Sequence, residues 1–81
     1  MIIEPLAAQI ADSTSASTAG GAVTVLAVNG GSTARLITLG GGATFTLAAG
    51  HTVIVKKGQD ETIVSAHADV KLTKVQTLGN Y

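Results

Sequence analysis

Residues 43–57 read ATFTLAAGHTVIVKK, and this stretch decides the fold class. Apolar and polar side chains alternate in its first part, so that Phe45 and Leu47 face one side while the neighbouring threonines face the other. Ala49-Gly50 is a turn signal, and a β-branched run over residues 51–57 follows it. The stretch therefore predicts two strands joined by a tight turn, with Phe45 near the centre of the core.

The same pattern of short apolar runs and glycine-rich turns continues on both sides of this hairpin. The predicted strands cover residues 22–29, 33–39, 43–48, 51–57, 61–66 and 69–75. The first of them is apolar on both faces, which is typical of a central strand covered on two sides. Strands of this length at spacings of about eight to twelve residues predict an all-β domain. We expect a small antiparallel β-sandwich or barrel of five to seven short strands.

Residues 1–21 have a different character from the rest of the chain. Their second half, DSTSASTAGG at residues 12–21, is small, polar and without periodicity. We predict that residues 1–21 form an extended or flexible N-terminal arm, and that residues 22–81 form a single small β-domain. A first edge strand, a frayed terminus or a short helix over residues 6–11 are the alternatives for this segment.

Composition excludes several classes of protein. The 81 residues are 46% hydrophobic and 12% charged with a formal net charge of zero, so the chain should fold. Nucleic-acid surfaces need a basic excess and stacking rings, and the aromatic residues are one Phe and one Tyr. No apolar window is long enough for a membrane span. The chain also lacks cysteine, so its small core predicts a homo-oligomer instead of a disulfide-stabilised fold.

The residue types of a nucleophilic triad occur together at Ser65, His67 and Asp69. Successive residues on one face of a strand lie about 6.6–6.8 Å apart, whereas a triad needs contacts of about 2.6–3.2 Å. We interpret the stretch as a turn in which Ser65 and Asp69 cap backbone groups. The chain is therefore not expected to be an enzyme, and no cofactor is predicted.

Metal ligands and basic residues also occur, without a local spacing that defines a site. His51 and His67 are predicted to be exposed at strand ends, and a metal site or a pH-sensitive interface are the alternatives. The basic side chains are predicted to lie on a solvated face or to protect a sheet edge from pairing, with a ligand-binding strip as the alternative. These residues are Arg35, Lys56, Lys57, Lys71 and Lys74.

Three segments have a pattern of strand and turn residues that also occurs in a known class of protein: NGGSTARLITL at residues 29–39, FTLAAGHTVIVKK at residues 45–57 and ETI at residues 61–63. In this pattern the chain resembles small virion accessory proteins of tailed bacteriophages, of the head decoration or cement type. The resemblance implies a compact β-domain made in the host cytoplasm that assembles, often as a trimer, on the outer surface of the head. It also implies that the domain bridges neighbouring major capsid subunits.

On this hypothesis the arm residues Leu6 and Ile10 are apolar anchors, and Arg35 and Lys56 are rim charges that orient the contact. A tail or head-tail connector component is an alternative with the same composition. A small ligand-binding β-module, such as a carbohydrate reader, is a second alternative. It would need exposed aromatic platforms, for which the candidates are Tyr81 and Phe45.

Overall fold

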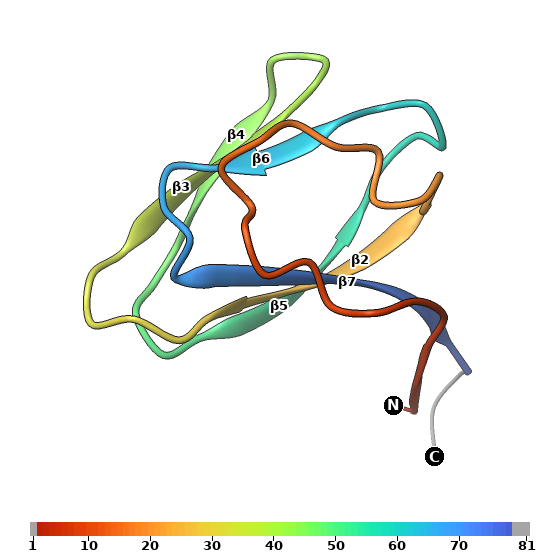
Figure 1. Ribbon diagram of the computed structural model, residues 1–81, viewed down its shortest axis with the longest axis horizontal. Helices are drawn as coiled ribbons and strands as arrows, with labels where there is room; N and C mark the ends of the chain where they lie inside the picture. Colours follow the sequence, from red (N-terminus) through yellow and green to blue (C-terminus); the bar gives the residue numbers. More distant parts are fainter. Residues whose placement is uncertain (1, 79–81) are drawn as a thin grey trace.

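The computed structural model describes residues 2–78, which contain seven β-strands and no helix (Figure 1). The strands are β1 (Ile3–Pro5), β2 (Thr24–Asn29), β3 (Arg35–Leu39), β4 (Thr44–Leu47), β5 (Thr52–Lys56), β6 (Ile63–Ser65) and β7 (Val70–Thr77). Strands β2 to β7 all begin within runs that alternation and turn residues predicted. The helix alternative over residues 6–11 is wrong.

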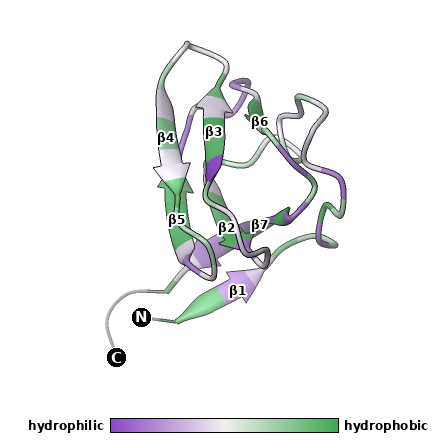
Figure 2. Cartoon of the chain, turned by 90° about the vertical axis from the view of Figure 1, so that its left-hand side faces the viewer, coloured by the Kyte–Doolittle hydropathy of each residue, from purple (hydrophilic) through white to green (hydrophobic). Residues whose placement is uncertain are grey.

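The strands form two antiparallel sheets that face each other (Figure 1). The larger sheet has the order β1-β7-β2-β5, and the smaller one has the order β4-β3-β6. The side chains between the sheets form one core, and the most deeply buried apolar residues are Val25, Ile37, Ile63, Val70 and Leu72. In Figure 2 the apolar positions follow the strands of both sheets. The predicted all-β sandwich is confirmed.

Phe45 does not lie at the centre of this core. It is partly buried and packs against the core from β4, which is an edge strand of the smaller sheet. The fully buried centre comes from strands with neighbours on both sides, as Ile37 shows on β3. The alternation correctly predicted that Phe45 faces inward, but it carries no information on which strand lies at the edge.

The outer face of the larger sheet carries apolar side chains among threonines and lysines, and no second layer covers it within residues 2–78. Leu26 and Val28 of β2 lie on this face and are half-buried, while Val25 and Ala27 on the inner face are buried. Ile54 of β5 is paired with Leu26 and lies beside it. The prediction that β2 is central in its sheet is confirmed, and the prediction that both of its faces are covered is wrong.

Residues 2–21 lie along one side of the sandwich and contact both sheets (Figure 1). β1 pairs with the end of β7, and Ile10 forms a further bridge to Leu72 of β7. The segment then crosses to the smaller sheet, where Ser17 bridges to Ile63 of β6. The predicted arm is thus an extended segment packed on the β-domain, and it covers the edges of β7 and β6.

Three lysines bind the backbone of this region and of the start of β2. The amine of Lys71 donates to the carbonyl of Ala11 at 2.7 Å, and that of Lys74 donates to Gly20 at 3.0 Å. The buried Lys57 donates to the carbonyls of Ala22, Gly58 and Glu61 at 2.6, 3.1 and 2.8 Å. Burial lowers the pKa of the Lys57 amine. These side chains hold loops in place, so the three lysines do not form a basic strip for a ligand.

Candidate functional site

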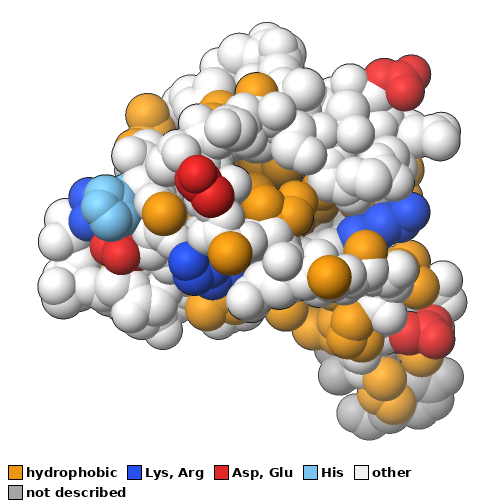
Figure 3. Space-filling view, in the orientation of Figure 1, with side chains coloured by type: hydrophobic (Ala, Val, Ile, Leu, Met, Phe, Trp, Pro, Cys, Tyr) orange, Lys and Arg blue, Asp and Glu red, His pale blue; other side chains and the backbone are white. Residues whose placement is uncertain are grey.

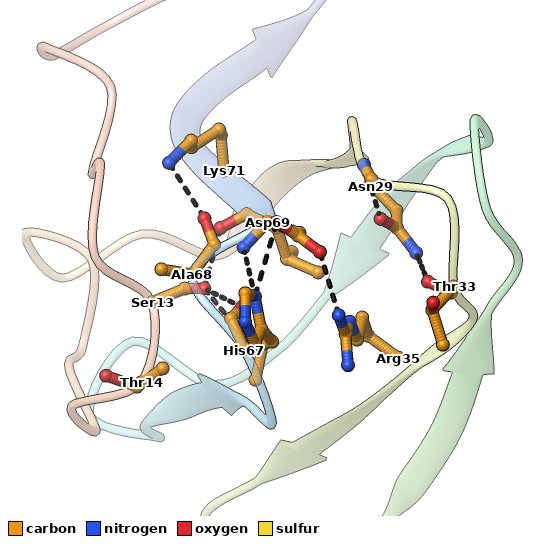
Figure 4. Close-up of polar contacts among 12 residues, drawn as sticks. Ser13, Thr14, Asn29, Thr33, Arg35, His67, Ala68, Asp69 and Lys71 are labelled. Carbon is orange, nitrogen blue, oxygen red and sulfur yellow. Dashed lines mark hydrogen bonds and ion pairs between the residues drawn. The ribbon is translucent and has the colours of Figure 1, made fainter.

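The hydroxyl-rich cluster between residue 13 and β6 is the first candidate, because it gathers serine, histidine and aspartate (Figure 4). Ser13 is buried, and its hydroxyl touches the hydroxyl of Ser65 and donates to the carbonyl of Val70 at 2.6 Å. The Ser65 hydroxyl donates to the carbonyl of His67 at 2.6 Å. Both hydroxyls are therefore bound to backbone carbonyls of the β6–β7 turn.

The geometry of this cluster does not support nucleophilic catalysis. His67 is exposed, and its Nδ1 accepts the backbone N–H of Asp69 at 3.0 Å, not a serine hydroxyl. Among residues 2–78, no hydrogen bond links the side chains of Ser65 and His67. The turn interpretation is confirmed for Ser65. It is wrong for Asp69, whose carboxylate is bound by a distant residue of β3.

That residue is Arg35, whose guanidinium donates to Asp69 Oδ2 at 2.9 Å. His67 Nδ1 lies 3.3 Å from the other carboxylate oxygen. The hydrogen bond from Arg35 lowers the pKa of the Asp69 carboxyl below its ordinary value of 3.8. Arg35, predicted as a rim charge, is thus engaged within its own chain, where it ties β3 to the start of β7.

The lowered pKa of Asp69 predicts a loss of stability in acid. A carboxyl whose pKa is lower in the folded chain stabilises the fold above its unfolded pKa of 3.8, and this contribution disappears as the pH falls through the folded value. Asp12, which accepts two hydrogen bonds from Thr14, acts in the same direction. We expect the free energy of unfolding of Asp69→Asn to fall less than that of the wild type between pH 4 and pH 2.

Urea unfolding followed by circular dichroism at each pH measures this difference. Asp60→Asn is the control, because that carboxylate is exposed and lies in the turn before β6. Parallel acid profiles for the wild type and Asp69→Asn would contradict the assignment.

The histidines do not meet. His51 lies at the start of β5 and His67 lies in the β6–β7 turn, and both are exposed, as predicted. Over residues 2–78, no three side chains of the metal-binding types converge, and the surface of the described part has no pocket. The same part contains no helix that is long and apolar enough to span a bilayer. The arrangement offers surfaces and edges for binding, not an enclosed site.

The most distinctive surface is a two-stranded projection that we call the terminal ribbon, residues 2–6 with residues 75–78. β2 pairs with β7 only as far as Lys74, so β1 is the strand neighbour of the last three residues of β7 among those described. Leu78 N–H donates to the carbonyl of Ile2 at 2.9 Å and closes the ribbon. The first and last described residues, Ile2 and Leu78, lie together on this ribbon (Figure 1).

The terminal ribbon carries exposed aliphatic side chains. Leu6 is 46% exposed, Ile2 is 44% exposed and Leu78 is 37% exposed. Hydrophobic atoms accordingly gather on the projection at the lower right of Figure 3, where a single acidic side chain interrupts them. An isolated two-stranded ribbon is marginally stable in water, and clustered exposed aliphatics mark binding surfaces. The ribbon is therefore the part of the described surface best suited to dock on another protein.

The four predicted contact residues have different environments. Leu6 lies on the terminal ribbon and is exposed, and Lys56 is exposed at the end of β5, so both are available to a partner. Ile10 packs against the core, and Arg35 is bound to Asp69. The structure does not bring the four together on one surface. Tyr81, an aromatic candidate for ligand binding, lies outside the described residues.

Sequence reasoning missed Ile2 and Leu78. The predicted last strand ended at residue 75, whereas β7 continues to Thr77. The sequence therefore contained no indication that residues 2–6 pair with the end of this strand. Comparison with known proteins adds no further site residue: no family model matches the chain, and neither a curated protein nor a solved structure matches it.

Proposed function

We propose that this protein is a structural virion protein, a decoration or cement protein that binds the outer shell of a phage head. The observation that carries the proposal is the terminal ribbon, which presents exposed Ile2, Leu6 and Leu78 on a projection away from the core. The resemblance of residues 22–75 to small virion accessory proteins supplies the class of partner. The partner is the major capsid protein.

The mechanism is thermodynamic. Aliphatic side chains on the ribbon bury apolar surface against a capsid subunit, and each bound copy stabilises the assembled shell relative to the free subunits by mass action. A copy that contacts two neighbouring subunits links them, so many copies oppose the outward pressure of the packaged genome. This role needs a rigid body with an accessible docking element. Neither an enclosed pocket nor a reactive cluster is required.

Leu6→Asp tests the docking element. The substitution places a charge where an exposed leucine would be buried in the complex, and we expect at least a tenfold loss of affinity for purified heads, equivalent to about 1.4 kcal/mol. Co-sedimentation of the protein with heads that lack it measures the bound fraction. The fold is expected to be unaffected, since Leu6 is 46% exposed in the free chain.

Leu36→Asp is the matched control. Leu36 is 47% exposed and lies on the outer face of the smaller sheet, so the two variants make the same chemical change at equal exposure. Equal loss of binding by both variants would reject the ribbon as the docking element. Absence of the wild-type chain from purified particles, measured by mass spectrometry against the shell protein, would reject the virion role altogether.

A further inference from the structure

The four outer edges of the two sheets are protected to very different degrees. The edges of β6 and β7 are covered by residues 2–21, through β1 and the bridges at Ile10 and Ser17. β1 is itself an edge, but it has three residues and includes Pro5, which has no backbone N–H to offer. β4, the open edge of the smaller sheet, has four residues. β5, the other edge of the larger sheet, has five residues and contains neither proline nor glycine.

Hydrogen bonds to β2 define which groups of β5 are free. The carbonyl of His51 accepts from Asn29, and the N–H of Lys57 donates to Val23, so the odd-numbered residues of this strand face β2. Thr52, Ile54 and Lys56 therefore direct their backbone N–H and C=O groups away from the sheet. None of these six groups is hydrogen-bonded to another residue of the described chain.

From this pattern we propose that two copies of the chain associate through β5, in antiparallel register about a two-fold axis at Ile54. In this register Ile54 lies opposite Ile54 of the second copy, and Thr52 lies opposite Lys56. All six free groups of each strand then exchange hydrogen bonds with the other strand. The two larger sheets become one continuous sheet of eight strands, which removes the longest open edge of the molecule.

The side chains fit this arrangement. Thr52, Ile54 and Lys56 all lie on the outer face of the sheet, so the two isoleucines form a cross-strand pair at the axis. Leu26 lies beside Ile54 within each copy, and the pair therefore joins two half-buried apolar surfaces into one. Each Lys56 faces a threonine, which keeps like charges apart. A lysine at position 54 would instead lie opposite the same lysine of the second copy, and the two charges would repel each other.

The interface is isologous, so the assembly has an even number of copies, in contrast to the trimer that the resemblance favours. The contact is also independent of the terminal ribbon, since β1 and β5 lie at opposite edges of the larger sheet. A chain can thus pair through β5 whether or not it binds a capsid.

Cross-linking tests the register directly, because the chain has no cysteine of its own. Residues in such a hydrogen-bonded pair have Cα and Cβ atoms about 5.5 Å apart, which is wider than the Cβ separation of about 3.5–4.5 Å in a disulfide. A short bifunctional maleimide is therefore the cross-linker, and we expect Ile54→Cys to form a covalent dimer with it at least tenfold faster than Thr73→Cys. Thr73 lies in the same row of the outer face, two strands from the edge, and is the matched control.

Analytical ultracentrifugation of the unmodified chain gives the second measurement. We expect the mean mass to rise from 8.0 kDa toward twice that value as the concentration approaches about 1 mM. Ile54→Lys should remain monomeric over the same range, while Ile54→Thr retains association. A trimeric mass, a monomer at every concentration, or equal cross-linking of the two cysteine variants would each overturn the proposal.

Discussion

Removing residues 1–21 is expected to leave the remaining chain unfolded. The segment contributes the buried Ser13 and Ala19, and it supplies the outer neighbours of β7 and β6. Without it, the free edges of β7 and β6 meet solvent and the core loses part of its cover. A domain of this size has a free energy of unfolding of about 4–12 kcal/mol. The loss of buried contacts and of edge hydrogen bonds at several positions together exceeds this value.

Circular dichroism and amide proton dispersion in a two-dimensional NMR spectrum measure the result. Removal of residues 1–6 is the matched control, because it takes away β1 and Leu6 but keeps Ile10, Ser13 and Ser17 in place. We expect this shorter deletion to fold and to lose binding to phage heads. Cooperative unfolding of residues 22–81 alone would show that the segment is a dispensable arm, as the sequence suggested.

Asn29→Asp has the second large expected effect. The side chain of Asn29 is fully buried, and its Nδ2 donates to the carbonyls of Thr33 at 2.9 Å and Leu47 at 3.0 Å. Its Oδ1 accepts the N–H of Gly31 at 3.0 Å. An aspartate of the same shape loses both donors and places a buried carboxylate against two carbonyl oxygens. We expect a loss of at least about 3 kcal/mol at pH 7.

The pH dependence identifies the cause of this loss. Burial beside carbonyls raises the pKa of the new carboxyl above its ordinary value of about 4, so the variant should be least deficient relative to the wild type below that pH. Its deficit should then grow as the pH rises and the group ionises. Urea unfolding of the variant and the wild type at low and at neutral pH measures this deficit. Gln9→Glu makes the same amide-to-carboxylate change at an exposed position, and an equal loss there would contradict this explanation.

The strands could be predicted because their information is local. Alternation in residues 43–48 identifies the inward face of β4, and the turn signals delimit β2 to β7 within a few residues. The packing of residues 2–21 could not be predicted in this way. Ser13 is buried through hydroxyl contacts with Ser65 and Val70, which are more than fifty positions away. A small polar residue with distant partners has the same local signature as a solvated linker.

The candidate site was predictable only in part, for the same reason. The role of Ser65 in a turn follows from neighbouring residues, and the structure bears it out. The ion pair of Arg35 joins residues 34 positions apart, which local patterns do not reveal. The side chain predicted as a rim charge is therefore bound to Asp69 of its own chain. The exposed ribbon depends on where β2 stops pairing with β7, which alternation does not encode.

The burial of Asn29 also limits the rate at which its side chain can deamidate. Asparagine followed by glycine is the sequence most prone to deamidation, in which the glycine nitrogen attacks the side-chain carbonyl carbon, ammonia leaves and a succinimide ring closes. Here the amide is bound at both ends, and the Gly30 N–H donates to the carbonyl of Asp69 at 3.1 Å. The ring can close only after this turn has opened. Deamidation of Asn29 would therefore record how often each copy has opened during its lifetime.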